Sequence, residues 1–223
     1  MEKQLAKKAG IRYGIGVLAV MLLLFLPAGT LRYAGGWRFL FVVFVPMLMM
    51  GLVLLKKDPA LLEKRLDSKE KQNTQKLVVL LSLLMFLGGF ILAGLDFRFD
   101  WFQLPRFVSR IAAGIFLAGY AMYAEVMREN SYLSRTVGVQ EGQKVVDTGL
   151  YGIIRHPMYT ATILMFTMIP LVLGSLAALP VFMLYLAIIV RRIGNEEQVL
   201  KMELPGYDAY LKKVKYRLFP KLW

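Results

Sequence analysis

Long, uninterrupted apolar runs constrain this chain more than any other feature. Residues 11–31, 37–55, 77–95 and 107–127 each approach or reach the roughly 20 residues that a helix needs to cross a hydrocarbon layer. Two further runs, 157–173 and 175–193, are separated only by Gly174, which predicts a tight antiparallel hairpin. The sequence therefore predicts an all-α, polytopic membrane protein with about six transmembrane helices.

The basic residues lie between these runs and predict the orientation of the chain. Segments 1–12, 56–76, 128–156 and 191–223 hold 23 of the 28 Lys and Arg residues, and under the positive-inside rule this places both termini in the cytoplasm. Because the basic residues sort by membrane side rather than onto a soluble module, the net charge of +13 favours the lipid bilayer as partner and disfavours nucleic acid. With no cysteine and one histidine, no metal site is predicted.

The polar segments divide the chain into two regions. Residues 1–127 hold four predicted spans and the polar loop 56–76, in which Leu61, Leu62 and Leu66 predict a short amphipathic helix lying on the membrane. Residues 128–223 hold a long polar loop, the hairpin and a charged tail, and we expect the chemistry there. In that tail an apolar stripe predicts a helix on acidic lipid or, alternatively, a lid over a ligand; its members are Tyr207, Tyr210, Leu211 and Val214.

The only histidine belongs to a motif at the start of the hairpin, Arg155-His156-Pro157-Met158-Tyr159. Proline suits the first helical position, so His156 is predicted to be the N-cap of a helix whose free amides, beside Arg155, favour an anion. The hairpin returns to the same face at Glu196-Glu197, which face this cationic wall and could hold a positive group. A purely structural alternative stays open, with a capping histidine, an anchoring arginine and glutamates paired with Arg192 and Lys201.

These motifs, taken with several others, carry a family resemblance. Along with Thr148-Gly149-Leu150-Tyr151, Gly206-Tyr207, Tyr210 and Arg217-Leu218-Phe219-Pro220, they resemble the integral-membrane methyltransferases of the isoprenylcysteine carboxyl methyltransferase family. The resemblance is strongest over about residues 128–220, and segment 94–99 is similar to bacterial members. Two positions depart from the family pattern: Ala161 stands where Gly is common, and Leu150 where Pro is common.

The resemblance implies a C-terminal hairpin that binds S-adenosylmethionine at the cytoplasmic face of a bacterial inner membrane, with a lipophilic methyl acceptor entering from the bilayer. It implies cofactor-binding roles for His156, Tyr159, Glu196, Tyr151, Gly149, Thr148 and Tyr207, and catalytic roles for Arg155, Glu197 and Asn130. A prenylcysteine carboxylate, a phospholipid amine and a small thiol all stay open as acceptors. Two alternatives are an NADPH-dependent, sterol-type membrane reductase and a non-enzymatic scaffold or lipid-binding protein. The sequence does not indicate an oligomeric state.

Overall fold

The computed structural model describes residues 2–66, 73–134 and 136–223, and these residues are helical apart from turns and loops. Within the described ranges the only extended pairing is an isolated bridge between Gln103 and Ser175, so the all-α prediction is confirmed. The elements are α1 Glu2–Ala28, α2 Ala34–Lys57, α3 Pro59–Leu66, α4 Asn73–Phe99, α5 Arg106–Glu129, the 3₁₀ helix η1 Gly149–Gly152, α6 Pro157–Leu173, α7 Leu179–Glu203 and α8 Tyr207–Lys213.

Among the described residues, four helices are long and apolar enough to cross a membrane, namely α1, α2, α4 and α5. The apolar helix α6 is shorter, with 17 residues, and α7 carries Arg191, Arg192 and Glu196 within its length. The six-span topology therefore stays a prediction. The predicted start of the last run at Ser175 is wrong, because residues 175–178 form a turn and α7 begins at Leu179. The same helix continues to Glu203, so the glutamate pair lies inside it.

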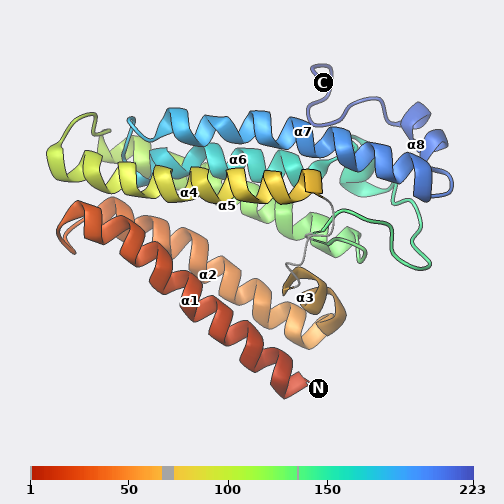
Figure 1. The fold of residues 1–223 in the computed structure, drawn as a ribbon, viewed down its shortest axis with the longest axis horizontal. Helices are drawn as coiled ribbons and strands as arrows, with labels where there is room; N and C mark the ends of the chain where they lie inside the picture. Colours follow the sequence, from red (N-terminus) through yellow and green to blue (C-terminus); the bar gives the residue numbers. More distant parts are fainter. Residues whose placement is uncertain (1, 67–72, 135) are drawn as a thin grey trace.

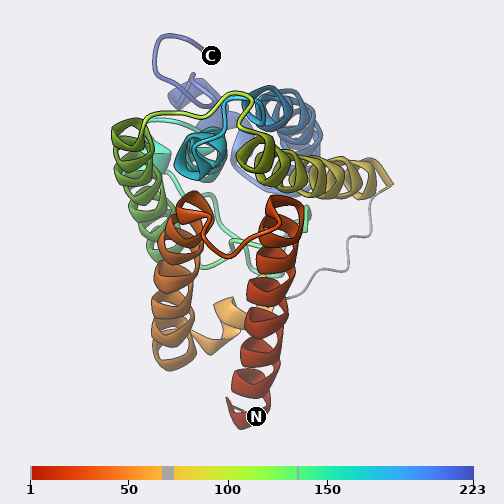
Figure 2. The same ribbon diagram turned by 90° about the vertical axis from the view of Figure 1, so that its left-hand side faces the viewer.

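The helices form two groups. Helices α4 to α7 run side by side as a bundle, and the α1–α2 hairpin leans away from it, as Figures 1 and 2 show. The N-terminus, α3, the loop after α5 and α8 lie toward one end of the molecule (Figure 1), which is the end that contains the histidine motif. Between the groups the core is aromatic: Phe39 of α2 packs against Phe90 of α4 and Phe116 of α5.

The predicted surface helix in the 56–76 loop exists as α3, but its apolar face is not directed at lipid. Leu61 and Leu62 are buried, and Leu61 packs in a cluster with Val126 and Tyr151. The membrane-facing role predicted for these leucines is therefore wrong, because the end of α5 and the loop that follows cover them. Residues 67–72 of this loop lie outside the described residues.

At the opposite end, a buried carboxylate joins the α4–α5 loop to the α6–α7 turn. Asp96 is fully buried and accepts hydrogen bonds from the Phe102 amide at 2.8 Å and from the Ser175 hydroxyl. The Ser175 oxygen in turn accepts the Ala178 amide at 3.2 Å. Gly174 closes α6 with a φ of 83°, a left-handed conformation that suits glycine. This clamp fixes the turn of the hairpin and hence the register of α6 against α7.

Replacing Asp96 with Ala should destabilise the protein by about 2 to 4 kcal/mol, because the Phe102 amide and the Ser175 hydroxyl would lose their buried acceptor. Thermal unfolding in detergent measures this loss as a lowered Tm. Asp100→Asn is the matched control, since Asp100 is exposed and Asn tolerates its positive φ. An equal fall in Tm for the two variants would contradict the clamp.

Candidate functional site

The histidine motif and the glutamate pair meet around one buried carboxylate. Glu197 of α7 accepts a hydrogen bond from Arg155 Nε at 2.8 Å and one from His156 Nε2 at 3.2 Å. Its other oxygen accepts Nε and Nη2 of Arg217 at 3.0 and 2.8 Å. Because an ionised carboxylate only accepts hydrogen bonds, His156 Nε2 carries the proton. We call these four residues, Arg155, His156, Glu197 and Arg217, the Glu197 cluster.

The cluster keeps Glu197 ionised. Burial alone would raise the pKa of this carboxyl, but hydrogen bonds from His156 and Arg217, together with the charge of Arg155, lower the pKa to about 2. The side chains of Arg155, His156 and Glu197 are only 9%, 4% and 5% exposed. A buried charge in this position is stable only while its partners are in place.

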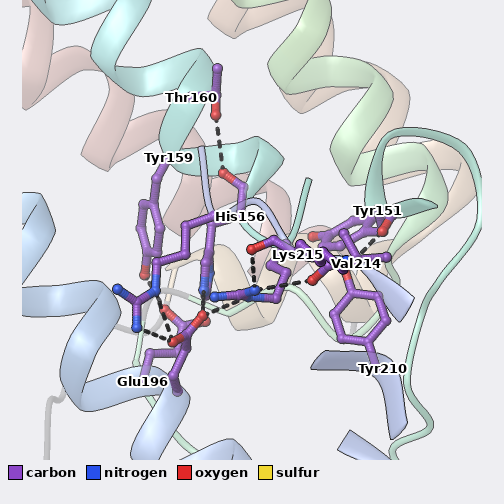
Figure 3. Close-up of polar contacts among 11 residues, drawn as sticks. Tyr151, His156, Tyr159, Thr160, Glu196, Tyr210, Val214 and Lys215 are labelled. Carbon is purple, nitrogen blue, oxygen red and sulfur yellow. Dashed lines mark hydrogen bonds and ion pairs between the residues drawn. The ribbon is translucent and has the colours of Figure 1, made fainter. Parts of the chain in front are cut away.

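Backbone hydrogen bonds bring the C-terminal tail to the same place. The amides of Arg155 and His156 donate to the carbonyls of Tyr216 and Arg217, both at 2.9 Å. Arg155 Nη1 donates to the carbonyls of Val214 and Lys215 at 3.0 and 2.7 Å. The start of α6, the middle of α7 and the tail after α8 are thus joined at one point, and Figure 3 shows His156, Val214 and Lys215 there.

Glu196, the other glutamate, points to a different group of partners. It accepts a hydrogen bond from the Tyr159 hydroxyl, and that hydroxyl also accepts Nε of Arg192 at 2.8 Å. The rings of His156 and Tyr159 stack with centroids 5.7 Å apart, as expected for residues one turn apart at a helix start. Figure 3 shows Tyr159, His156 and Glu196 close together. The two adjacent glutamates therefore have separate tasks.

The 3₁₀ helix η1 and the end of α5 supply the next wall. Glu129 accepts the Leu150 amide at 3.1 Å, and Asn130 Nδ2 donates to the Tyr151 hydroxyl at 2.9 Å. Gly149 has a φ of 50°, and a Cβ there would lie 1.4 Å from Oε1 of Glu129, so any other residue would strain the backbone and displace this carboxylate. Tyr210 of α8 donates its hydroxyl to the Tyr151 carbonyl at 2.8 Å, which links α8 to this wall.

Between these walls lies an open pocket with about 850 Å³ of empty space, its mouth included. Seven of the ten predicted site residues line this pocket: Asn130, Tyr151, Arg155, His156, Tyr159, Glu196 and Tyr207. The other three, Thr148, Gly149 and Glu197, do not line it. Glu197 stands behind the wall and Gly149 fits the backbone against Glu129; Thr148 precedes η1 and makes no capping bond with its side chain.

One buried atom in this pocket lacks a partner. The Tyr207 hydroxyl is buried, and no hydrogen-bond partner for it exists among the described residues. Burial, together with the nearby charges of Glu197 and Glu196, raises the pKa of Tyr207, so the phenol stays neutral and can donate. Buried hydroxyls are nearly always hydrogen-bonded, so this one is a candidate contact for a bound ligand.

The prediction that the tail stripe lies on lipid is wrong. Tyr207, Tyr210 and Val214 are buried in a cluster with Leu204, and Val139 and Val145 of the loop pack against it. The charged side of α8 faces outward instead, where Lys213 pairs with Asp147 at 2.6 Å. Helix α8 thus covers the pocket, in the position that the lid alternative required.

Sequence reasoning missed three residues of this site. Arg217 holds Glu197, Arg192 holds Tyr159, and Tyr210 holds the Tyr151 carbonyl. Arg217 could have been found from the family-like segment 217–220. A buried glutamate needs several cationic partners, and the histidine motif supplies only one arginine. Tyr210 was marked only as a member of the possible lid stripe and of the family-like motifs, and no local pattern marked Arg192 as part of a pocket.

Acid should weaken the Glu197 cluster in a defined pH window. The pKa of Glu197 is about 2 in the folded protein against 4.5 for the ordinary group, so its stabilisation is complete above about pH 4.5 and is lost as the pH falls toward 2. We expect a loss of about 3 kcal/mol across this window. Glu197→Gln should be destabilised at pH 7 and show a flatter acid branch in Tm measurements.

Glu203→Gln, at the exposed end of α7, is the matched control and should keep the wild-type acid branch. If Glu197→Gln retained the same steep loss of stability below pH 4.5, another carboxyl would be responsible and the cluster would not control acid unfolding.

Comparison with known proteins gives one match, over the segment that builds this pocket. Residues 111–202 match the model of the isoprenylcysteine carboxyl methyltransferase (ICMT) family. The matched segment contains most of α5, the following loop, α6 and most of α7, and therefore both glutamates and the histidine motif. No curated protein matches the chain. The family match confirms the resemblance of the motifs: over residues 111–202 the chain is similar to the ICMT family of membrane methyltransferases.

Proposed function

We propose that the protein transfers a methyl group from S-adenosylmethionine to a lipophilic or membrane-associated acceptor at the cytoplasmic face of a bacterial inner membrane. The observation that carries this proposal is the unpartnered Tyr207 hydroxyl inside a pocket with cationic and anionic walls. The family match over the same segment agrees with methyl transfer.

The residues of the pocket fit a zwitterionic nucleoside cofactor. Arg155, which lines the pocket, suits a carboxylate, and Glu196 on the facing helix suits an ammonium group. Tyr151, Tyr159 and Tyr207 offer aromatic faces, which attract a cationic sulfur centre.

S-adenosylmethionine, when bound, supplies an electrophilic methyl group for an in-line displacement. The protein then has to align the two reactants and exclude water, which accounts for several kcal/mol of barrier lowering. We assign the exclusion of water to α8, which covers the pocket through Tyr207 and Tyr210. Glu197 does not line the pocket, so we assign it a positioning role that holds Arg155 and His156 in place.

The acceptor determines whether a base is needed. A carboxylate or thiolate acceptor reacts without one, whereas an ammonium group must first lose a proton. Glu196 is the carboxylate that lines the pocket among the described residues, and its hydrogen bond from Tyr159 keeps it oriented toward His156. We assign Asn130, which lines the pocket and donates to the Tyr151 hydroxyl, the role of orienting the acceptor.

Calorimetric titration with S-adenosylhomocysteine tests the cofactor site. The wild-type protein should bind it, Tyr207→Phe should bind about 10-fold more weakly through loss of one hydrogen bond, and Glu196→Gln should lose more. Tyr216→Phe, outside the pocket, is the control and should bind normally. Stabilisation by NADPH but not by S-adenosylhomocysteine would favour the reductase alternative, and stabilisation by neither would favour the scaffold.

Incubation with methyl-labelled S-adenosylmethionine and a total lipid extract tests the acceptor class. We expect label in the organic phase with wild-type protein and a loss of at least about 100-fold with His156→Ala or Glu196→Ala, because both residues line the pocket. Labelling that persisted in these variants would contradict the site.

A further inference from the structure

The short helix α3 presents a guanidinium that the pocket described above does not use. Arg65 lies one turn after the buried Leu61 and Leu62, and its side chain turns inward to donate Nη2 to the Tyr123 hydroxyl. The guanidinium carbon lies 5.5 Å from the centroid of the Tyr123 ring. Arg65 is thus held in place by α5 instead of extending into solvent.

This guanidinium is incompletely satisfied. Its Nη1 is buried and has no hydrogen-bond partner, and no carboxylate lies within ion-pair distance of Arg65 among residues 2–66, 73–134 and 136–223. Arg155 and Arg217, by contrast, share Glu197. A buried cationic donor without an anion is costly, and an anionic ligand would supply the missing acceptor.

Arg65 adjoins the wall of the pocket. Tyr123, its partner, packs in the same cluster as Tyr151 and Met158, and both of these line the pocket. Burial raises the pKa of Tyr151, and the positive charge of Arg65 acts on the same hydroxyl in the opposite direction. The neighbouring Lys64 reaches the loop as well, donating to the Ser131 carbonyl at 3.3 Å. Helix α3 therefore contacts the region on both sides of Asn130.

The surroundings of Arg65 also suit an apolar chain. Met50 and Leu54 of α2 pack against the cluster beneath α3, and the neighbouring Leu52 and Val53 are 51% and 47% exposed on the outside of α2. In a membrane this surface is covered by hydrocarbon. A molecule with an anionic head and an apolar tail matches a buried cation beside such a surface.

We propose that Arg65 binds the anionic group, a phosphate or a carboxylate, of the membrane amphiphile that the enzyme methylates. This inference rests on the proposed methyl transfer, and it assigns α3 to the acceptor and the C-terminal half to the cofactor. Arg65 is then a specificity-determining residue whose charge holds the head group next to the Tyr151 and Met158 wall.

The direct test measures binding to the full-length protein in dodecyl maltoside micelles. The probes are dodecyl phosphate and dodecanoate, with dodecanol as the neutral probe, and the phosphate and carboxylate arms separate the two head-group chemistries. The wild-type protein should bind at least one anionic probe and not dodecanol. Arg65→Gln should weaken that binding about 10- to 100-fold, the loss expected for a charged hydrogen bond.

Two further variants serve as controls for this test. Lys57→Gln removes an exposed cation at the end of α2, near α3, and should change the affinity by no more than about twofold. Arg65→Lys keeps the charge without the forked donors and should retain part of the affinity. Equal binding by wild type and Arg65→Gln, or equal binding of dodecanol by the wild type, would overturn the proposal.

Kinetics connect the anion site to the acceptor. Arg65→Gln should raise the KM for the labelled lipid fraction with little change in kcat, and the anionic probe should compete with that fraction. The affinity for S-adenosylhomocysteine should be unchanged. A variant that was merely misfolded would lose this affinity as well. Non-competitive inhibition would overturn the acceptor assignment. Failure of the wild type to bind S-adenosylhomocysteine would refute the methyl-transfer function separately, because probe binding is measured without cofactor.

Discussion

The ionised side chain of Glu197 is the point on which the rest of the site depends. Two guanidinium groups and the His156 imidazole surround this buried carboxylate, and they come from the start of α6 and from the tail after α8. A buried ion group of this kind contributes little net stability, but removing one member is costly because the others lose their counter-charge. The cluster therefore acts mainly through geometry: it holds Arg155 and His156 at the pocket and leaves Glu196 free to face a ligand.

The hairpin of α6 and α7 is fixed at both ends by buried carboxylates. Asp96 holds the turn at one end, through Phe102 and Ser175, and Glu197 holds the helices together at the other. Between them α6 and α7 pack mainly through apolar side chains, with a hydrogen bond from the Tyr185 hydroxyl to the Thr162 hydroxyl at 2.9 Å. In a bilayer, apolar contacts alone give little preference for one register over another. The polar ends supply that preference, so the distance between the His156 ring and the Glu196 carboxylate is set by both.

The helical class, and the meeting of the histidine motif with the glutamate pair, could be predicted from the sequence because each rests on a local signal. Apolar length marks the helices, the proline after His156 marks a helix start, and the glutamate pair breaks the basic pattern of its surroundings. The parts that failed depend on tertiary contacts. The spacing of the stripe that begins at Tyr207 does not indicate whether it faces lipid or protein. The partners of Arg192 and Arg217 lie in other parts of the chain. The same limit applies to Leu61 and Leu62 of α3.

The family match covers the segment from α5 to α7 and leaves the N-terminal helices outside it. Residues 111–202 contain most of the walls that suit the cofactor, and a cofactor shared by many enzymes requires the same walls in each. Helices α1 to α3 lie outside the match, and Arg65 of α3 donates to Tyr123 of α5, which packs beside the pocket wall. Acceptors differ between enzymes. The contacts that select an acceptor are therefore expected in a segment whose sequence differs between enzymes. Under the proposed function, the C-terminal half of the fold binds the cofactor and the N-terminal half binds the acceptor. Helix α3 connects the two halves.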